Sequence, residues 1–242
     1  MSALGGRLAL ITGASRGIGA AVARALADAG ARVVRVARVL PGDDPRYVDL
    51  PCDLTDRAQV DALAARVLDG PGVPSIVVNN AGGFLLRTLE DTTPDEFDAQ
   101  IGLNLRASFL LARAFLPAMR RAGGGIFVSI GSVADHTGFP ENAAYAASKY
   151  GLRGLHETLA AEYQGTGVRL TLVSPGATDT TIWDPFAPEH RSGFTPRAAM
   201  LRPEDVADAV LFAATRPEHV HVDWIRLQSS GRIATASPHP PS

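Results

Sequence analysis

Short apolar, β-branched stretches recur along the chain and alternate with segments whose apolar positions have helical spacing. The most continuous stretches predict strands that are covered on both faces, at residues 7–13, 31–37, 75–82, 125–132 and 168–176. A shorter stretch at 47–53 and an alternating one at 219–227 predict two further strands, the second at an edge of the sheet.

Helical segments lie between these strands. Over residues 16–29 apolar side chains recur every three or four positions, and Gly30 follows where a helix would end. Residues 93–96 (TPDE) have the pattern of a capping box with proline at the first helical position, and a last helix is expected over 203–215. This alternation predicts an α/β fold with a parallel sheet of about seven strands and helices on both faces.

The chain shows no internal repeat and no linker that would divide it. We therefore expect one domain over residues 1–235, followed by a flexible tail over 236–242, where the sequence is ASPHPPS.

Composition excludes several classes of protein. The 242 residues include 23 Lys or Arg and 25 Asp or Glu, so a formal net charge of −2 gives no electrostatic basis for binding nucleic acid or an anionic membrane. No apolar run reaches the roughly 20 residues that span a bilayer, and the first residues lack the pattern of a secretion signal. One cysteine and six scattered histidines predict neither a disulfide nor a metal site. We expect a cytoplasmic protein.

A glycine-rich turn follows the first strand and opens the first helix. Residues 12–19 read TGASRGIG, with Gly13, Gly17 and Gly19 spaced G-x-x-x-G-x-G rather than in the common dinucleotide pattern G-x-G-x-x-G. Backbone N–H groups in such a turn and the positive end of the helix both favour a phosphate group. The segment therefore predicts a nucleotide site.

The end of the second strand bears on which nucleotide is bound. A carboxylate there would bond the ribose hydroxyls of NAD, whereas a basic residue suits the 2′-phosphate of NADP. The strand ends at Arg38, and Arg16 in the glycine turn approaches the same place, so NADP(H) is preferred and NAD(H) is the alternative. The alternative interpretation is that both arginines are solvated charges on the surface. The connection over 39–46 is too short for a crossover helix, which would leave the adenine side more open.

Three polar side chains predict acid–base chemistry. Tyr145 and Lys149 are four residues apart and share a helix face, and Ser132 ends an earlier strand. A phenol has an ordinary pKa of about 10, and we expect the Lys149 ammonium and a nicotinamide cation to lower it. The Ser132 hydroxyl can bond a substrate carbonyl.

With the segments 53–54, 79–82 and 175–176 and with Asn104, these motifs resemble the short-chain dehydrogenase/reductase family in its compact form. The resemblance extends over residues 7–215. It implies a Rossmann-like, doubly wound sheet and hydride transfer between NADP(H) and a small carbonyl or alcohol, as in carbonyl and 3-oxoacyl reductases. It also implies a homotetramer or dimer.

The resemblance assigns a role to each motif. Tyr145 would give or take the proton, Lys149 would hold the nicotinamide ribose, Ser132 would position the carbonyl, and Asn104 would tie a water to Lys149. The expected cofactor contacts include Tyr145 and Lys149 together with Gly13, Ser15, Arg16, Gly17, Ile18, Gly19, Arg38, Asp53, Leu54, Asn80, Ala81, Gly82, Pro175, Gly176, Thr178 and Thr180.

Other interpretations of single residues stay open. Asn79 is expected to act as scaffold, and Asn104 taken alone would be a buried helix asparagine paired with a carbonyl. Asp53 alternatively precedes a helix capped by Thr55. His136 lies where the family lines its substrate pocket, but we interpret it as a loop residue rather than a catalytic base.

The segment between residue 180 and the last helix carries Trp183, Phe186 and Phe194. Family members place a mobile substrate lid there, which would favour a hydrophobic or ring-bearing ketone, and the alternative is a packed surface loop. Two other functions remain as alternatives: a non-catalytic NADP-binding sensor or scaffold, and an NAD-dependent alcohol or dihydrodiol dehydrogenase.

Overall fold

The computed structural model describes residues 2–42 and 44–230, and the tail expected over 236–242 lies outside them. The strands form one seven-stranded sheet in the order β3-β2-β1-β4-β5-β6-β7, and every neighbouring pair is parallel. Their bounds are β1 (Leu8–Thr12), β2 (Arg32–Ala37), β3 (Tyr47–Pro51), β4 (Ile76–Asn79), β5 (Gly125–Ile130), β6 (Val168–Pro175) and β7 (Trp224–Leu227). The fold class expected from the sequence, a Rossmann-like α/β domain, is confirmed.

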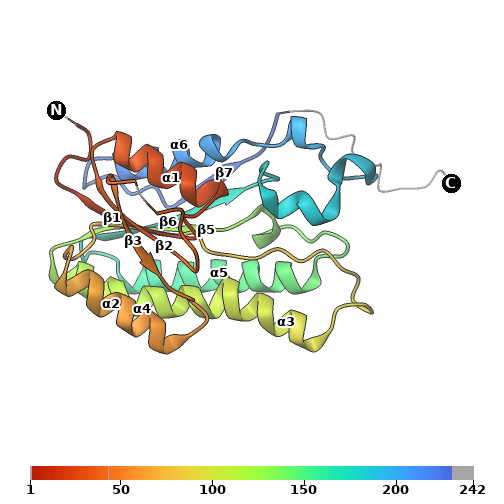
Figure 1. The fold of residues 1–242 in the computed structure, drawn as a ribbon, viewed down its shortest axis with the longest axis horizontal. Coiled ribbons are helices and arrows are strands. Elements are labelled where there is room, and N and C mark those ends of the chain that lie inside the picture. Colours follow the sequence, from red (N-terminus) through yellow and green to blue (C-terminus); the bar gives the residue numbers. More distant parts are fainter. Residues whose placement is uncertain (1, 43, 231–242) are drawn as a thin grey trace.

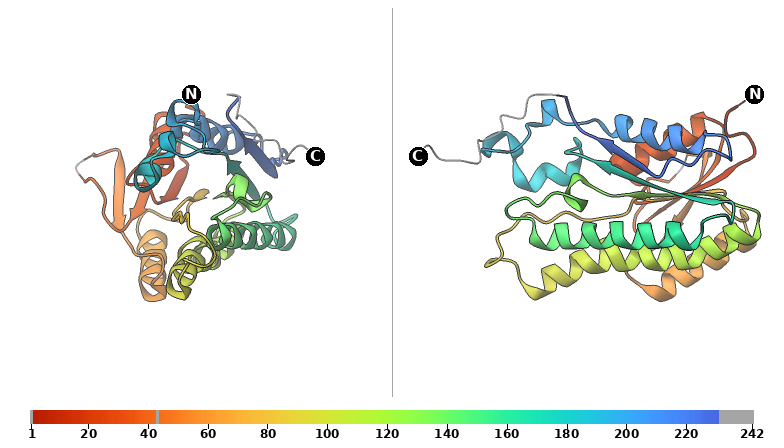
Figure 2. Two further views of the ribbon diagram at one scale, coloured as in Figure 1. Left: turned by 90° about the vertical axis from the view of Figure 1, so that its right-hand side faces the viewer. Right: turned by 180° about the vertical axis from the view of Figure 1, so that it is seen from behind.

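Helices cover both faces of the sheet, as Figures 1 and 2 show. The helices are α1 (Gly17–Asp28), α2 (Arg57–Asp69), α3 (Pro94–Ile101), α4 (Ala107–Arg121), α5 (Ala143–Glu162) and α6 (Pro203–Ala214). α1 and α6 lie together on one face, and α2, α4 and α5 lie on the other. No helix among the described residues is both long and apolar enough to cross a bilayer.

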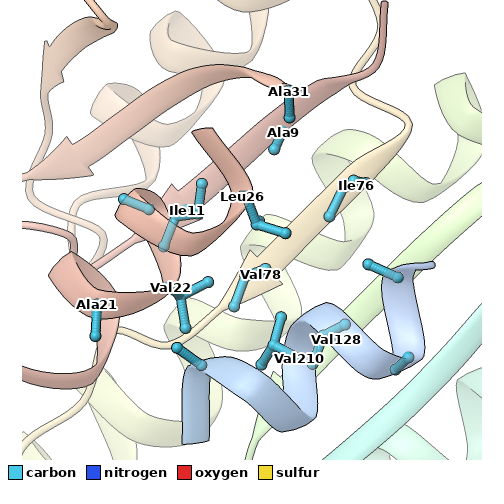
Figure 3. Close-up of a cluster of buried hydrophobic side chains, with 14 of the residues drawn as sticks. Ala9, Ile11, Ala21, Val22, Leu26, Ala31, Ile76, Val78, Val128 and Val210 are labelled. Atoms are coloured by element: carbon cyan, nitrogen blue, oxygen red, sulfur yellow. The ribbon is translucent and has the colours of Figure 1, made fainter. Parts of the chain in front are cut away.

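Two hydrophobic cores result, one on each side of the sheet, because successive side chains of a strand point to opposite faces. Ile11, Val78 and Val128 pack under α1 and α6, where Figure 3 shows them beside Val22 and Val210. Their neighbours in the strands belong to the core against α2 and α4; they are Leu10, Val77 and Phe127. The continuously apolar stretches of the sequence are therefore strands covered on both faces, as predicted.

The helix caps and the connection after β2 test three local predictions. The capping box at Thr93 and Glu96 is present at the start of α3, and residues 38–46 form no helix where the structure describes them. The predicted cap of α2 was wrong, because the side chain that accepts from the first-turn N–H groups belongs to Asp56 rather than to Thr55.

The last strand is shorter than predicted. β7 begins at Trp224, and residues 219–223 are irregular. Side chains explain the difference, because the carbonyl groups of Val220 and Val222 accept hydrogen bonds from Arg169 and Thr171 of β6. The position at the edge of the sheet is as predicted.

Candidate active site

The parallel strands bring the functional segments to one edge of the sheet. The order of strands reverses between β1 and β4, and in open α/β sheets ligands bind beyond the carboxyl ends of the strands at such a point. The glycine turn follows β1, Asn80 follows β4, Ser132 follows β5 and Gly176 follows β6.

The glycine turn is tied to the end of β4. Thr12 Oγ1 accepts hydrogen bonds from the N–H groups of Asn80 at 3.0 Å and Ala81 at 3.1 Å, and Asn80 Nδ2 donates to the Thr12 carbonyl at 2.9 Å. Gly13 has φ +64°, and a Cβ there would lie 2.9 Å from Ala81 Cα. A Cβ at Gly19 would overlap the Gly13 carbonyl. Only glycine fits these two positions, so Asn80 and Ala81 shape the turn from behind.

The start of α1 suits a phosphate group. The first N–H groups of a helix have no partner within the helix, and the Arg16 side chain at the N-cap position accepts none of them. No acidic residue lies in the first turn, which contains Gly17, Ile18 and Gly19. Thr180 lies above this turn, because a Cβ at Gly17 would be 3.2 Å from Thr180 Cγ2. The residues present therefore fit the pyrophosphate of a dinucleotide.

The end of β2 lies beside the glycine turn. The Val36 carbonyl accepts a hydrogen bond from Ala14 N–H, and Arg38 follows as an exposed residue. Arg16 is exposed too, so the structure places both arginines at the same edge, on adjacent strand ends. Whether they meet on one phosphate stays a prediction.

Two residues expected at the adenine are engaged by the protein itself. The Asp53 carboxylate accepts from the N–H and hydroxyl of Thr55, which lowers the pKa of Asp53, and the charge of Arg38 adds to this effect. The Leu54 side chain is buried in the core against α2 and α4. An adenine contact by Asp53 or Leu54 therefore stays a prediction, and the simpler role of Asp53 in its own turn is present.

Ser132 and Tyr145 meet at the end of β5. Ser132 begins a short 3₁₀ turn, where its hydroxyl accepts from Ala134 N–H at 3.2 Å, and Tyr145 lies in the first turn of α5. The Tyr145 side chain lies beside that of Ser132, close enough for the Ser132 hydroxyl to lower the pKa of the phenol. The structure therefore brings these two side chains together.

Lys149 lies beneath this pair and is buried. Its Nζ donates to the Ile130 carbonyl at 3.0 Å and lies 5.8 Å from the centre of the Tyr145 ring. It is the only lysine in the chain, whereas arginine supplies every other basic side chain apart from the histidines. This uniqueness is a signal in the sequence that the motif search did not use.

Burial shifts the pKa values of Tyr145 and Lys149. Burial raises the pKa of Tyr145 to about 12, with the Ser132 hydrogen bond opposing that rise. Burial also lowers the pKa of Lys149 to about 8. The pKa of Tyr145 therefore lies above its ordinary value rather than below it as expected, because loss of solvent disfavours the charged form of each group.

Asn104 braces the chain that follows β4. It lies in a π-helical stretch between α3 and α4, where its Oδ1 accepts from Gly83 N–H at 2.8 Å. Its Nδ2 donates to the Gly83 carbonyl at 3.1 Å and to Ser148 Oγ at 2.9 Å. A Cβ at Gly82 would lie 3.0 Å from Asn104 Oδ1 and 3.7 Å from Lys149 Nζ. The Asn104 amide is therefore close to Lys149, and it is also paired with a backbone carbonyl. Both the role beside Lys149 and the role of a buried, paired asparagine fit the structure. The contact through a water stays a prediction.

The segment after β6 is held by hydrogen bonds at the same edge of the sheet. Gly176 N–H donates to the Leu227 carbonyl at 2.8 Å, and Thr178 Oγ1 donates to the Gly176 carbonyl at 3.0 Å. Pro175 is the last residue of β6. These contacts hold the turn in place beside the site, while contacts of Pro175, Gly176 and Thr178 with a cofactor stay predictions.

An aromatic cluster lies against Tyr145. The Phe84 ring is 4.8 Å from that of Tyr145, 5.0 Å from that of Trp183 and 5.2 Å from that of Phe186, measured between ring centres. Phe194 joins through Trp183 at 6.4 Å. Sequence reasoning found the last three aromatic residues but missed Phe84, whose place directly after the Asn-Ala-Gly-Gly segment was the available signal.

Comparisons with known proteins agree with this geometry. A family model described as short chain dehydrogenase matches residues 7–191. An uncharacterized oxidoreductase of Staphylococcus aureus (strain MRSA252) is 33% identical, with 94% of this chain and 99% of that protein covered. The D-threitol dehydrogenase of Mycolicibacterium smegmatis is 35% identical over 88% of this chain and 87% of its own length.

A solved structure gives a similar result. A metagenomic short-chain oxidoreductase in complex with NADP matches with a TM-score of 0.80 and 35% identity, over 96% of this chain and all of that one. The chain therefore belongs to the short-chain dehydrogenase/reductase family, and it is an NAD(P)-dependent oxidoreductase.

Proposed function

We propose that the protein interconverts a carbonyl compound and the corresponding alcohol with NADP(H), with Ser132, Tyr145 and Lys149 as catalytic residues. The observation that carries this proposal is that Ser132 and Tyr145 lie side by side, next to a buried lysine, at the point where the strand order reverses. A protein that only bound a nucleotide would have no need of this arrangement.

The reduction requires a hydride at the carbonyl carbon and a proton at its oxygen. When bound, the nicotinamide supplies the hydride. The Ser132 hydroxyl donates to the carbonyl oxygen and orients it, and the Tyr145 hydroxyl gives its proton to the same oxygen as the C=O bond becomes a C–O bond. In the oxidation Tyr145 accepts the proton instead.

The pKa values of Tyr145 and Lys149 favour the reduction at neutral pH. A Tyr145 pKa of about 12 keeps the phenol protonated and ready to donate. A Lys149 pKa of about 8 leaves most of the amine charged at pH 7, so an ammonium is present to stabilise the phenolate that remains after transfer. Asn104 supports this site by fixing the segment beside Lys149.

The preference for NADP(H) over NAD(H) rests on Arg16 and Arg38. Both are exposed at the strand ends where an adenosine ribose would lie, and a similar oxidoreductase was solved with NADP. For the substrate, the aromatic cluster around Tyr145 favours an apolar or ring-bearing carbonyl compound.

The assembly and its place in the cell are part of the same proposal. We expect a homotetramer or dimer in the cytoplasm, formed through the helices that carry Asn104 and Tyr145. Phe109 of α4 and Tyr150 of α5 expose 49% and 46% of their surface, which supports a contact there. Gel filtration of Phe109→Ser, compared with the unmodified protein, tests the assembly.

The test of the activity is Tyr145→Phe, with Tyr150→Phe as the matched control on the same helix. We expect Tyr145→Phe to lower kcat/KM for carbonyl reduction by roughly 10²- to 10⁴-fold, because the proton donor is lost, while NADPH affinity stays close to normal. Nicotinamide absorbance with a panel of carbonyl compounds and fluorescence titration with NADPH measure the two quantities. Normal turnover in Tyr145→Phe would refute the mechanism, and NADPH binding without turnover across the panel would favour the non-catalytic alternative.

A further inference from the structure

A fully buried carboxylate lies behind Ser132, and the reaction as described does not use it. Asp135 has no exposed surface, and its Oδ2 accepts from Ser132 N–H at 3.1 Å and from Ser174 Oγ at 2.6 Å. A Cβ at residue 131 would overlap this oxygen, so Gly131 leaves the space that the carboxylate occupies. The backbone that presents Ser132 is therefore built around a negative charge.

The other oxygen of Asp135 is connected to an arginine on the far strand. Asp135 Oδ1 lies 2.6 Å from His136 Nδ1, and His136 Nε2 lies 2.8 Å from Arg226 Nη2 in β7. A guanidinium can only donate, so Nε2 accepts and the ring proton is on Nδ1, which donates to Asp135. A neutral imidazole thus joins the carboxylate to the guanidinium, and His136 is no catalytic base in this arrangement.

The same strand holds Asp135 by a second route. Trp224 Nε1 donates to Ser174 Oγ at 2.9 Å, and the Ser174 hydroxyl in turn donates to Asp135. The Trp224 ring contacts the His136 ring, with their centres 5.5 Å apart. Asp135 is therefore fixed from β6 and β7 together, by residues more than 30 positions away in sequence.

The charge of the carboxylate also acts on Tyr145 and Lys149. Its negative charge raises the pKa of Tyr145, in addition to burial, and raises the pKa of Lys149 against the stronger effect of burial. The charged and titratable groups on the elements packed around Asp135 include Tyr145 and Lys149 of α5, His136 of its own turn, Arg226 of β7 and Asp223 before it. Arg153 of α5 and Arg226 both lie over the Trp224 ring.

We propose that Asp135 is a positioning residue of the active site, which fixes the Ser132 backbone and places a negative charge near Tyr145 and Lys149, while His136 and Arg226 hold its carboxylate and partly offset its charge. This proposal deepens the proposed function and rests on it for its kinetic part. Its electrostatic part concerns the protein alone and can be measured without turnover.

The single lysine of the chain gives that measurement. In protein labelled with ¹³C at the lysine Cε position, one resonance reports the titration of Lys149. Asp135→Asn keeps the size and an acceptor oxygen but removes the charge, so we expect the pKa of Lys149 to fall by about one unit. For the same reason, we expect the pH profile of kcat/KM to move to lower pH.

Arg226→Gln supplies a change of opposite sign at an exposed position, where folding is not at risk. Loss of the guanidinium leaves the Asp135 charge less offset, so the Lys149 resonance and the rate profile should both move to higher pH by a few tenths of a unit. Arg226→Lys should restore the original values, and Asp223→Asn, an exposed carboxylate beside Trp224, should leave them unchanged.

If the network were merely structural, Asp135→Asn and Arg226→Gln would lower kcat but would shift neither the Lys149 titration nor the pH profile of kcat/KM. That result would overturn the proposal. Shifts of the same sign in Asp135→Asn and Arg226→Gln would overturn it too. If Asp135→Asn does not fold, the shift in Arg226→Gln and its reversal in Arg226→Lys decide the matter. A protein with the expected Lys149 titrations but no turnover on any carbonyl compound would refute the proposed function and leave the electrostatic assignment standing.

Discussion

The two ends of the candidate site are built differently. At the end with the proposed catalytic residues, Ser132 and Lys149 are buried and hydrogen-bonded to the backbone, and Tyr145 lies beside Ser132. At the adenosine end, Arg16 and Arg38 are exposed, and neither makes a side-chain hydrogen bond or ion pair with another described residue.

This difference separates what the fold determines from what a few charges determine. The geometry of the proposed catalytic residues is fixed by the packing of the protein, at the cost of removing an amine and a phenol from water. The proposed cofactor preference depends on exposed side chains that can change without disturbing any packing. Substitutions at the first end should therefore affect chemistry and stability, and those at the second should affect affinity alone.

The largest effect is expected from Lys149→Met. Removal of the ammonium takes away the positive charge that we expect to stabilise the phenolate of Tyr145, so kcat/KM for carbonyl reduction should fall by roughly 10²- to 10⁴-fold. Circular dichroism should show an unchanged fold, because methionine fills most of the same space. Substantial turnover in this variant would mean that the phenol is stabilised by other groups.

A buried histidine, His156 of α5, should make the protein sensitive to acid. This side chain is buried in α5, its Nδ1 lies 3.1 Å from Ser129 Oγ, and burial lowers its pKa to about 4. The unfolded chain takes up a proton near pH 6.5 and the folded protein only near pH 4, so stability should fall as the pH drops from about 6.5 to about 4. The shift corresponds to about 3 kcal/mol in the free energy of unfolding.

Denaturant unfolding at several pH values measures this loss. His156→Gln should remove that part of the pH dependence, whereas His219→Gln, at an exposed position, should not. If the unmodified protein and His156→Gln lose the same stability between pH 6.5 and pH 4, His156 does not stay neutral in the folded state.

Features that depend on local sequence could be predicted without the structure. The apolar strands, the capping box at Thr93 and the missing helix over 38–46 follow from a few neighbouring residues. The motif spacing also placed Tyr145 and Lys149 on one helix face, and the structure brings Ser132 to them.

Features that depend on packing between distant parts of the chain could not be predicted from the sequence. In the link from Asp135 through His136 to Arg226, the contact between His136 and Arg226 joins residues 90 positions apart. This contact exists only because β7 lies beside β6. The direction of the Tyr145 pKa depends on how much solvent the folded chain removes, which spacing does not express. One local signal was nevertheless present for Asp135, which stands at the third position after Ser132 in a capping box.

The smallest effect is expected at the adenosine end. If Arg38 contacts the 2′-phosphate, Arg38→Ala should weaken NADPH binding by about tenfold, because one charge-assisted hydrogen bond is lost at an exposed site. NADH lacks that phosphate, so its affinity should stay the same. Arg16→Ala should act in the same direction, and fluorescence titration with both cofactors measures the ratio of affinities.

Arg32 provides the matched control, because it is exposed at the other end of β2, away from the carboxyl edge of the sheet. Arg32→Ala should change neither affinity, so any general effect of lost positive charge is separated from a contact at residue 38. A parallel loss for NADPH and NADH in Arg38→Ala would place the arginine against a group that both cofactors share, such as the adenine or the pyrophosphate. The preference for NADP would then have to come from Arg16 alone, and the double variant Arg16→Ala/Arg38→Ala would show whether the rest of the open adenosine end discriminates between the cofactors at all.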